Sequence, residues 1–267
     1  LGVCKQIVEG MVAAGLTREE AMSRFVICTS VGALGKADGS CGNPNAKRGI
    51  NEERLEWVNP AVPDGMSMVD VIKTFKPTCL LGLAAQNGGL FTETMVSSML
   101  DYCERPIVMP MSNPTSKHEC TPAQAYQWTN GKAVVATGSP FDPVTLPDGS
   151  VRVTSQCNNV YVFPGIGLAA SIAGVKEITD GMLYAAAVAC ADAMTDKEKG
   201  EGRTFPCISR IRDVSHAVAC AVIQEALDTK MTTAFTRLQM SPTEIANLVA
   251  RKMYNPTYSP LVDPRGQ

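Results

Sequence analysis

The pattern of apolar and polar positions changes period repeatedly along the chain. Apolar residues recur at helical spacing in segments such as Val3–Ala14, where Val3, Ile7 and Met11 form one stripe. Short apolar runs stand between such segments. We group these runs as strand-like, and they are Phe25–Cys28, Cys79–Leu83, Ile107–Met109, Ala133–Thr137 and Tyr161–Phe163. Short strands that alternate with helices indicate a parallel sheet covered on both faces, so we predict an α/β fold.

Helix start signals fall between the apolar runs. Thr17 and Glu20 form a capping-box pattern, Ser67 precedes a helix that runs to Phe75, and Thr121 before Pro122 begins another. The other predicted helices are Phe91–Tyr102, Ile166–Val175, Gly181–Met194, Ile211–Asp228 and Pro242–Met253. The leading architecture is a doubly wound, mostly parallel sheet of the Rossmann type with C-terminal helices. We assign residues 1–228 to this dinucleotide-binding type of fold and residues 229–267 to a linker, a final helix and a tail.

Composition narrows the class of protein. The 267 residues are 45% hydrophobic and 19% charged, with a net charge of −2, as in a soluble globular domain. We expect no nucleic-acid partner, because the chain has no basic stripe, and no membrane span, because its longest apolar run, Met182–Ala193, is too short. The ten cysteines stand singly without a CxxC pair. That spacing argues against structural zinc and favours reduced thiols in the cytoplasm or the mitochondrial matrix.

One glycine pattern suggests a dinucleotide fingerprint. Residues Pro164–Ala170 fit GxGxxA after an apolar run and before a helix. An acidic residue should end the next strand about 20 residues on, but Ile178–Asp180 reads as a helix cap instead. We therefore favour a packing role, in which the glycines let a helix pack closely or let backbone approach a ligand.

The chain starts at Leu1 inside a predicted helix, so we expect the true fingerprint in an upstream part of the protein. The ribose-binding acid would then stand after Phe25–Cys28, where the sequence has Thr29 and Ser30. A carboxylate there would pair with a ribose 2′-hydroxyl and repel a 2′-phosphate, so its absence favours NADP slightly over NAD. Candidates to meet the extra phosphate are Lys36, Lys47 and Arg48, for which a solvated surface position is the simpler explanation.

Two polar loops carry asparagines. Asn113 follows a predicted strand and precedes Pro114, which favours an extended Asn113, and a second loop holds Asn158 and Asn159. Ligands of open α/β sheets bind at the carboxyl ends of the strands. An amide there donates to a carboxylate or accepts from a hydroxyl without adding charge, which suits a dicarboxylate beside a metal. The alternative is that these asparagines are ordinary turn residues.

These loops resemble the malic enzymes. The similar stretches are SNPTSK (112–117), ATGSPFDPVTLPDG (136–149), QCNNVYVFPGIGL (156–168), PTCLLGLAAQNGGLFT (77–92) and EGR (201–203). The resemblance runs from Leu1 to about Asp228 and implies a Rossmann-type NAD(P) domain. It also implies oxidative decarboxylation of (S)-malate to pyruvate and carbon dioxide with reduction of NAD(P).

The resemblance assigns roles to particular positions. It implies that Asn113 contacts both malate and the nicotinamide side of the cofactor, and that Asn158 and Asn159 hold malate. The small residues expected to line the dinucleotide are Gly82, Ala84 and Ala85, with Thr29 and Ser30 at the ribose position. The family's catalytic tyrosine and lysine, its malate-binding arginine, its acidic ligands for Mg²⁺ or Mn²⁺ and its glycine fingerprint match no position in this chain.

We therefore expect the catalytic and metal-binding part upstream, a full-length protein that forms a homo-oligomer, and little or no activity from the 267 residues alone. Three alternatives stay open. They are a malolactic-type enzyme, another hydroxy- or amino-acid dehydrogenase on the same fold, and a non-enzymatic module with a degenerate nucleotide site.

Overall fold

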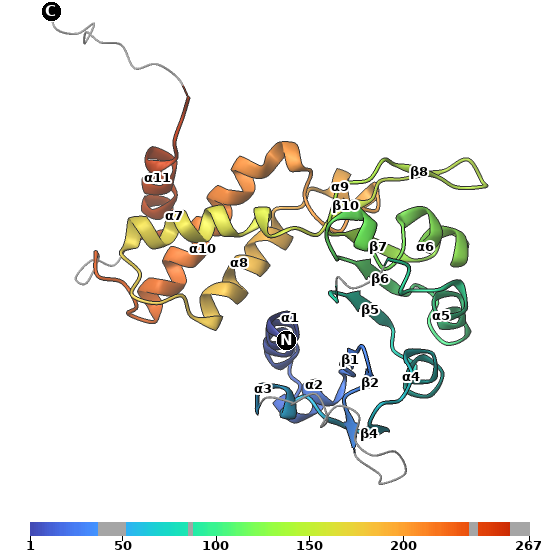
Figure 1. The fold of residues 1–267 in the computed structure, drawn as a ribbon. Coiled ribbons are helices and arrows are strands. Elements are labelled where there is room, and N and C mark those ends of the chain that lie inside the picture. The colour runs from blue at the N-terminus through green and yellow to red at the C-terminus, as the bar shows by residue number, and fades with distance from the viewer. Residues whose placement is uncertain (37–51, 85–87, 235–239, 257–267) are drawn as a thin grey trace, which may run out of the picture. The chain divides into compact units, whose positions relative to one another are not determined.

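The structure is a computed structural model that describes residues 1–36, 52–84, 88–234 and 240–256 (Figure 1). Contacts divide the chain into two compact units. Unit 1 comprises Leu1–Asn159 and Met194–Ile208, and unit 2 comprises Val160–Ala193 and Ser209–Gln267. The domain boundary after Asp228 stays a prediction.

Unit 1 is built on a four-stranded parallel sheet, as predicted. Its strands are β5 (Cys79–Gly82), β6 (Ile107–Pro110), β7 (Val134–Thr137) and β10 (Ser155–Gln156), in the order β10-β7-β6-β5. Helices α4 (Met68–Phe75), α5 (Glu93–Ser98) and α6 (Pro122–Trp128) lie along one side of it (Figure 1). The parallel sheet and the alternating helices confirm the predicted α/β class.

The main core of unit 1 lies between the sheet and these helices. Burial alternates along β5 and β6, because successive side chains of a strand point to opposite faces. Leu80 and Val108 point inward and pack in one cluster with Val135, Met99 and Tyr126. Sheet and helices thus share a single apolar layer.

The helix starts follow the sequence cues. Thr17 caps α2 (Arg18–Ser23) and Thr121 caps α6, each with a reciprocal capping box. The hydroxyl of Ser67 accepts the backbone N–H of Asp70 at 3.2 Å and so caps α4. These bonds satisfy N–H groups that the first helical turn leaves without a partner. The predicted helix Phe91–Tyr102 is shorter, since it consists of α5 and a 3₁₀ turn, η2 (Met99–Asp101).

The segment before the sheet contains short elements. They are α1 (Gly2–Ala13), β1 (Cys28–Thr29), β2 (Gly32–Ala33), β3 (Gly35–Lys36), α3 (Glu52–Leu55) and β4 (Asn59–Pro63). β3 pairs with β4 in parallel, and β1 pairs with β2 in antiparallel fashion.

The predicted strand Phe25–Cys28 is wrong for most of its length. Only Cys28 belongs to β1, and in the described ranges β1 pairs with β2 and not with the four-stranded sheet. The side-chain amide of Asn59 donates to the carbonyl oxygens of Ser23 and Phe25 at 3.1 and 2.7 Å. A side chain therefore supplies hydrogen bonds that a neighbouring strand would otherwise make.

The segment Tyr161–Phe163, grouped above with the strands, is helical instead. It passes through a 3₁₀ turn, η4 (Asn159–Tyr161), into α7 (Phe163–Ala173). Pro164 lies in the first turn of α7, where a missing N–H costs no helical hydrogen bond. The strand that precedes the second asparagine loop is β10, whose two residues carry no apolar signal.

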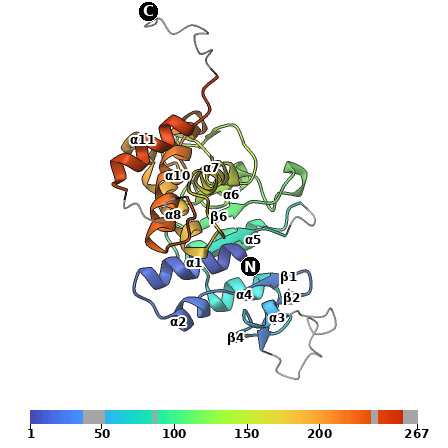
Figure 2. The same cartoon turned by 90° about the vertical axis from the view of Figure 1, so that its left-hand side faces the viewer.

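Unit 2 is helical. It consists of α7, α8 (Asp180–Asp192), α10 (Ile211–Asp228) and α11 (Pro242–Lys252). α10 packs against the other three, as Figure 2 shows from a second direction. Its inward side chains, among them Val214, Val218 and Val222, are fully buried.

The glycine pattern of Pro164–Ala170 serves this helix packing. A Cβ atom on Gly165 would lie 2.6 Å from Cγ1 of Val218 and 2.8 Å from the carbonyl oxygen of Ser215, both on α10. A Cβ atom on Gly167 would have no atom within 4 Å. The predicted packing role is therefore confirmed for Gly165, because α7 approaches α10 more closely than a side chain permits.

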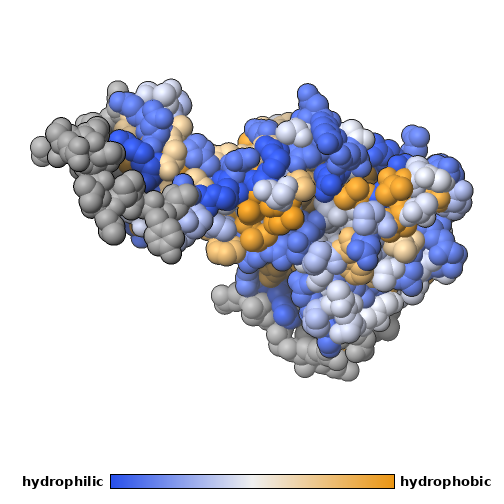
Figure 3. Space-filling model, turned by 90° about the horizontal axis from the view of Figure 1, so that it is seen from above, coloured by the Kyte–Doolittle hydropathy of each residue, from blue (hydrophilic) through white to orange (hydrophobic). Residues whose placement is uncertain are grey.

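The surface mixes both kinds of side chain. Figure 3 shows hydrophilic side chains over much of one face, with hydrophobic ones in separate patches. Leu83 and Phe163 are among the exposed large apolar residues, at 53% and 57%. In the part of the chain that the structure describes, no helix combines the length and apolar character that a membrane crossing requires.

Candidate functional site

Two strand ends at one edge of the sheet carry the predicted substrate residues. Asn113 follows β6, and Asn158 and Asn159 follow β10, with β7 between these two strands. The strands are parallel, so their carboxyl ends meet at the same edge. The Asn113 and Asn159 side chains are exposed and that of Asn158 is half-buried. The bond between Asn113 and Pro114 is cis.

The turn after β7 links the two asparagine loops. The Ser139 hydroxyl donates to Oδ1 of Asn113 at 2.5 Å. On its other side, the carbonyl oxygen of Gly138 accepts from Nε2 of Gln156 at 3.3 Å and from Nδ2 of Asn158 at 3.4 Å. The structure thus brings Asn113 and Asn158 to one hydrogen-bonded group, as two amide loops at one sheet edge suggested.

Sequence reasoning singled out residues 136–149 only for their family resemblance and missed what Gly138 and Ser139 do. A Cβ atom on Gly138 would lie 2.3 Å from the carbonyl oxygen of Met111 and 3.1 Å from Nδ2 of Asn113. Only glycine fits that gap. The available signal was a polar Thr-Gly-Ser turn directly after a buried strand, between two asparagine loops.

A buried carboxylate holds the start of the Asn113 loop. Glu119 is 1% exposed. Its carboxylate accepts hydrogen bonds from the Ser112 hydroxyl and, at 3.4 Å, from the Ser112 backbone N–H. A Cβ atom on Gly82 would lie 2.3 Å from Cδ of Glu119. The missing side chain of Gly82 therefore makes room for this carboxylate between the ends of β5 and β6. Contact of Gly82 with a dinucleotide stays a prediction.

His118 is a second buried group of this loop that sequence reasoning did not single out. It is 4% exposed, and its ring stacks edge-on against Phe141, with the ring centres 5.1 Å apart. Neither ring nitrogen has a hydrogen-bond partner among the described residues. Burial lowers the pKa of His118, and the nearby Glu119 carboxylate opposes that shift, so the imidazole is neutral near pH 7.

The residues predicted to bind the cofactor lie in different kinds of position. Ala84 is exposed just after β5, and Ala85 lies outside the described residues. The Thr29 hydroxyl donates to the carbonyl oxygen of Gly32 at 3.0 Å and accepts the N–H of Val31 at 3.2 Å, so it stabilises its own turn. Ser30 is exposed beside it.

Of the residues proposed to bind a 2′-phosphate, the structure describes only one. Lys36 is exposed at the end of β3, whereas Lys47 and Arg48 lie outside the described residues. Because β1 is not a strand of the four-stranded sheet, the structure does not join Thr29 and Ser30 to the edge that carries Asn113.

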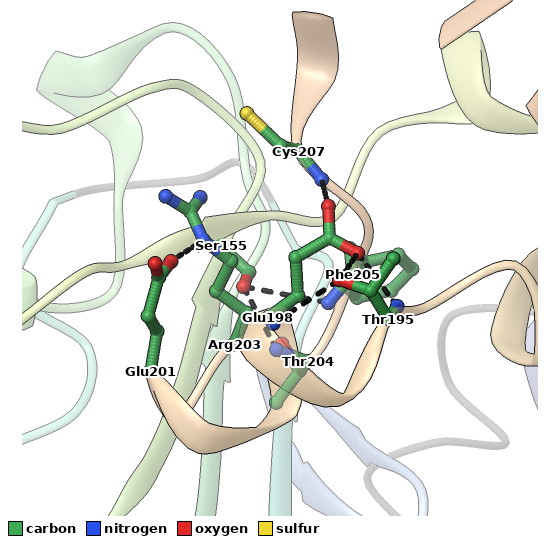
Figure 4. A network of polar contacts seen from close by, with 8 residues as sticks. All are labelled: Ser155, Thr195, Glu198, Glu201, Arg203, Thr204, Phe205 and Cys207. Atoms are coloured by element: carbon green, nitrogen blue, oxygen red, sulfur yellow. Dashed lines mark hydrogen bonds and ion pairs between the residues drawn. The ribbon is translucent and has the colours of Figure 1, made fainter. Parts of the chain in front are cut away.

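A polar network fixes β10 just before Asn158 (Figure 4). Oγ of Ser155 accepts the backbone N–H of Thr204 at 2.9 Å and that of Phe205 at 3.4 Å. Glu198 of α9 (Asp196–Gly200) is buried and accepts the N–H of Cys207 at 2.7 Å. Segment 194–208 is therefore fastened to β10, and an ion pair of 2.8 Å between Arg203 and Glu201 lies in the same segment.

The chemistry that this edge offers is neutral hydrogen bonding. Elsewhere, burial raises the pKa of Cys28 on β1 and of Cys79 at the amino end of β5 to about 11. Burial and the Glu119 charge raise the pKa of Cys120 to about 12, so these three thiols stay protonated. No group of three His, Cys, Asp or Glu side chains in the described ranges is placed to hold a metal ion. Side-chain amides can donate to a carboxylate, but the described part of the chain offers no ligand set for a metal.

Comparison with known proteins places these features in a family. The model of the malic enzyme NAD-binding domain matches residues 1–227. The NAD-dependent malic enzyme of Acinetobacter baylyi is 38% identical over 258 residues, which cover 96% of this chain and 44% of that protein. The NADP-dependent malic enzyme of Rattus norvegicus is 36% identical over 262 residues, which cover 98% and 43%. The chain thus spans less than half the length of these relatives.

A solved structure shows the same fold. The crystal structure of Entamoeba histolytica malic enzyme matches with a TM-score of 0.63 at 22% identity, over 85% of this chain and 41% of that one. The family model and the relatives show that the chain belongs to the malic enzyme family, whose NAD-binding domain it contains.

Proposed function

We propose that this chain is the part of a malic enzyme that binds NAD(P) and positions malate against it, for oxidative decarboxylation to pyruvate and carbon dioxide. The observation that carries the proposal is the linked group of amides at the carboxyl edge, with Asn113 bridged to Ser139 and Asn158 bridged to Gly138. Both NAD- and NADP-dependent malic enzymes are among the relatives.

Each residue of this edge has a proposed task. Nδ2 of Asn113 donates to the substrate on the nicotinamide side, while Asn158 and Asn159 hold the malate carboxylate and hydroxyl. A nicotinamide cofactor would supply the hydride-transfer chemistry when bound, and this chain would orient the substrate toward it. Gly82, Ala84 and Ala85 line the dinucleotide with little bulk. Neutral amides bind a dicarboxylate without adding negative charge beside the Mg²⁺ or Mn²⁺ ion that the other part of the enzyme would hold.

We further propose a preference for NADP over NAD, since no carboxylate stands at Thr29 or Ser30 to repel a 2′-phosphate. Calorimetric titration of the chain with each dinucleotide tests it, and equal affinities would contradict it. We also propose that the full-length protein is a homo-oligomer in the cytoplasm or the mitochondrial matrix.

Product analysis separates a malic enzyme, which forms pyruvate, from a malolactic enzyme, which forms lactate.

Replacing Asn113 by alanine tests the substrate role. In the full-length enzyme, Asn113→Ala should lower kcat/KM for malate by about tenfold or more, because the lost amide acts mainly as the transition state forms. Steady-state NAD(P)H formation measures the effect. The matched control is Asn247→Ala, which removes an exposed asparagine from α11. Unchanged kinetics of Asn113→Ala would make the loop merely structural.

A further inference from the structure

Ser139 occupies a position that decides which end of the Asn113 side chain a ligand meets. We propose that Ser139 is a positioning residue that holds the Asn113 carboxamide with its NH₂ group free to donate to malate. Its hydroxyl donates to Oδ1 of Asn113, the acceptor end of the amide. This inference rests on the proposed function and adds to it a residue that acts through Asn113.

The orientation follows from what each group can donate. A carboxylate only accepts hydrogen bonds, so Asn113 must offer it Nδ2, which leaves Oδ1 in need of another donor. Ser139 is the donor that the structure places there. Without it, the amide can rotate and present its carbonyl oxygen to the carboxylate, a repulsive arrangement.

The backbone of the turn is held by other groups. The hydroxyl of Thr137, which is fully buried, donates to the carbonyl oxygen of Ser139 at 2.9 Å. Gln156 and Asn158 donate to the carbonyl oxygen of Gly138. Removing only the Ser139 hydroxyl therefore leaves the turn anchored on both sides, and its loss affects Asn113 alone.

Enzyme kinetics of three variants test the assignment in the full-length enzyme. Ser139→Ala should lower kcat/KM for malate about fivefold, as expected for one lost hydrogen bond, with an unchanged unfolding temperature. Ser139→Thr keeps a hydroxyl and should recover activity to within about twofold of the parent. The control Ser150→Ala removes a hydroxyl that bonds Asp148 in another turn and should change nothing.

A double-mutant cycle separates a role through Asn113 from a general structural role. In an Asn113→Ala background, Ser139→Ala should have no further effect on kcat/KM, because its target is gone. Effects of the two substitutions that multiply independently would overturn the proposal. So would a Ser139→Ala enzyme with unchanged kcat/KM while Asn113→Ala is impaired.

An NMR spectrum of the 267-residue chain tests the contact without activity. The side-chain NH₂ signals that vanish in Asn113→Ala should shift in Ser139→Ala and stay in place in Ser150→Ala. Unshifted signals would refute the contact. A different result would contradict the proposed function, namely a parent enzyme that shows no malate-dependent reduction of NAD(P).

Discussion

At the scale of single residues, the site depends on buried polar groups that hold exposed ones. Glu119 fixes Ser112 just before Asn113, and Ser155 fixes the strand just before Asn158. His118 differs from both, since neither of its ring nitrogens has a partner within the described ranges. A buried imidazole without partners remains in place only as the neutral form, because its charged form would lose its hydration.

His118 should therefore make stability depend on pH. Burial lowers its pKa in the folded chain. As the pH falls through about 6.5, the unfolded chain binds a proton at this imidazole that the folded chain does not yet bind. The contribution of His118 to the free energy of unfolding should thus be complete above that pH and decrease below it. Urea denaturation at about pH 7.5 and about pH 5.5 measures the difference.

His118→Leu should remove this part of the pH dependence, while the control His216→Gln, which replaces the chain's other histidine, should keep it. An equal loss of stability on acidification in His118→Leu and in the parent protein would contradict the argument.

At the scale of elements, capping and close helix packing decide the arrangement. The caps of α2, α4 and α6 are readable from sequence because an N-cap bond joins residues three apart in the chain. The sequence could not show that the predicted strand Phe25–Cys28 is mostly absent. Its conformation depends on Asn59, which lies more than thirty residues away in the chain. β10 was equally hidden, since a two-residue strand has no periodicity.

The two glycines of α7 should respond to alanine in opposite directions. Gly165→Ala should destabilise the protein by roughly 1 kcal/mol or more, because overpacking against α10 outweighs the gain in helix propensity. Gly167→Ala, the matched control with open space around its Cβ atom, should stabilise it by up to about 1 kcal/mol. Denaturant unfolding compares them. Equal stabilities would mean that α7 does not pack closely at Gly165.

At the scale of the whole molecule, the chain forms two compact units. The amide edge lies in unit 1, and α7, α8, α10 and α11 form unit 2. The described residues hold no ligand set for a metal ion. We propose that this chain contributes the orientation of the substrate.

The 267-residue chain alone should therefore show little or no malate-dependent reduction of NAD(P), even with Mg²⁺ or Mn²⁺ added. Absorbance of NAD(P)H measures the rate, and circular dichroism shows that the inactive chain is folded. A rate like that of an intact malic enzyme would contradict this prediction.

The sequence by itself determined the α/β class, the starts of the helices and the loops that carry the amides. Those features rest on periodicity and on contacts between near neighbours. Only the tertiary structure decided that Ser139 meets Asn113, 26 residues away, and that Gly138 meets Asn158. It also decided that Glu119 fills the space over Gly82. Such contacts form because parallel strands bring loops that are distant in the chain to one edge of the sheet. A local sequence pattern does not specify which of these distant residues meet.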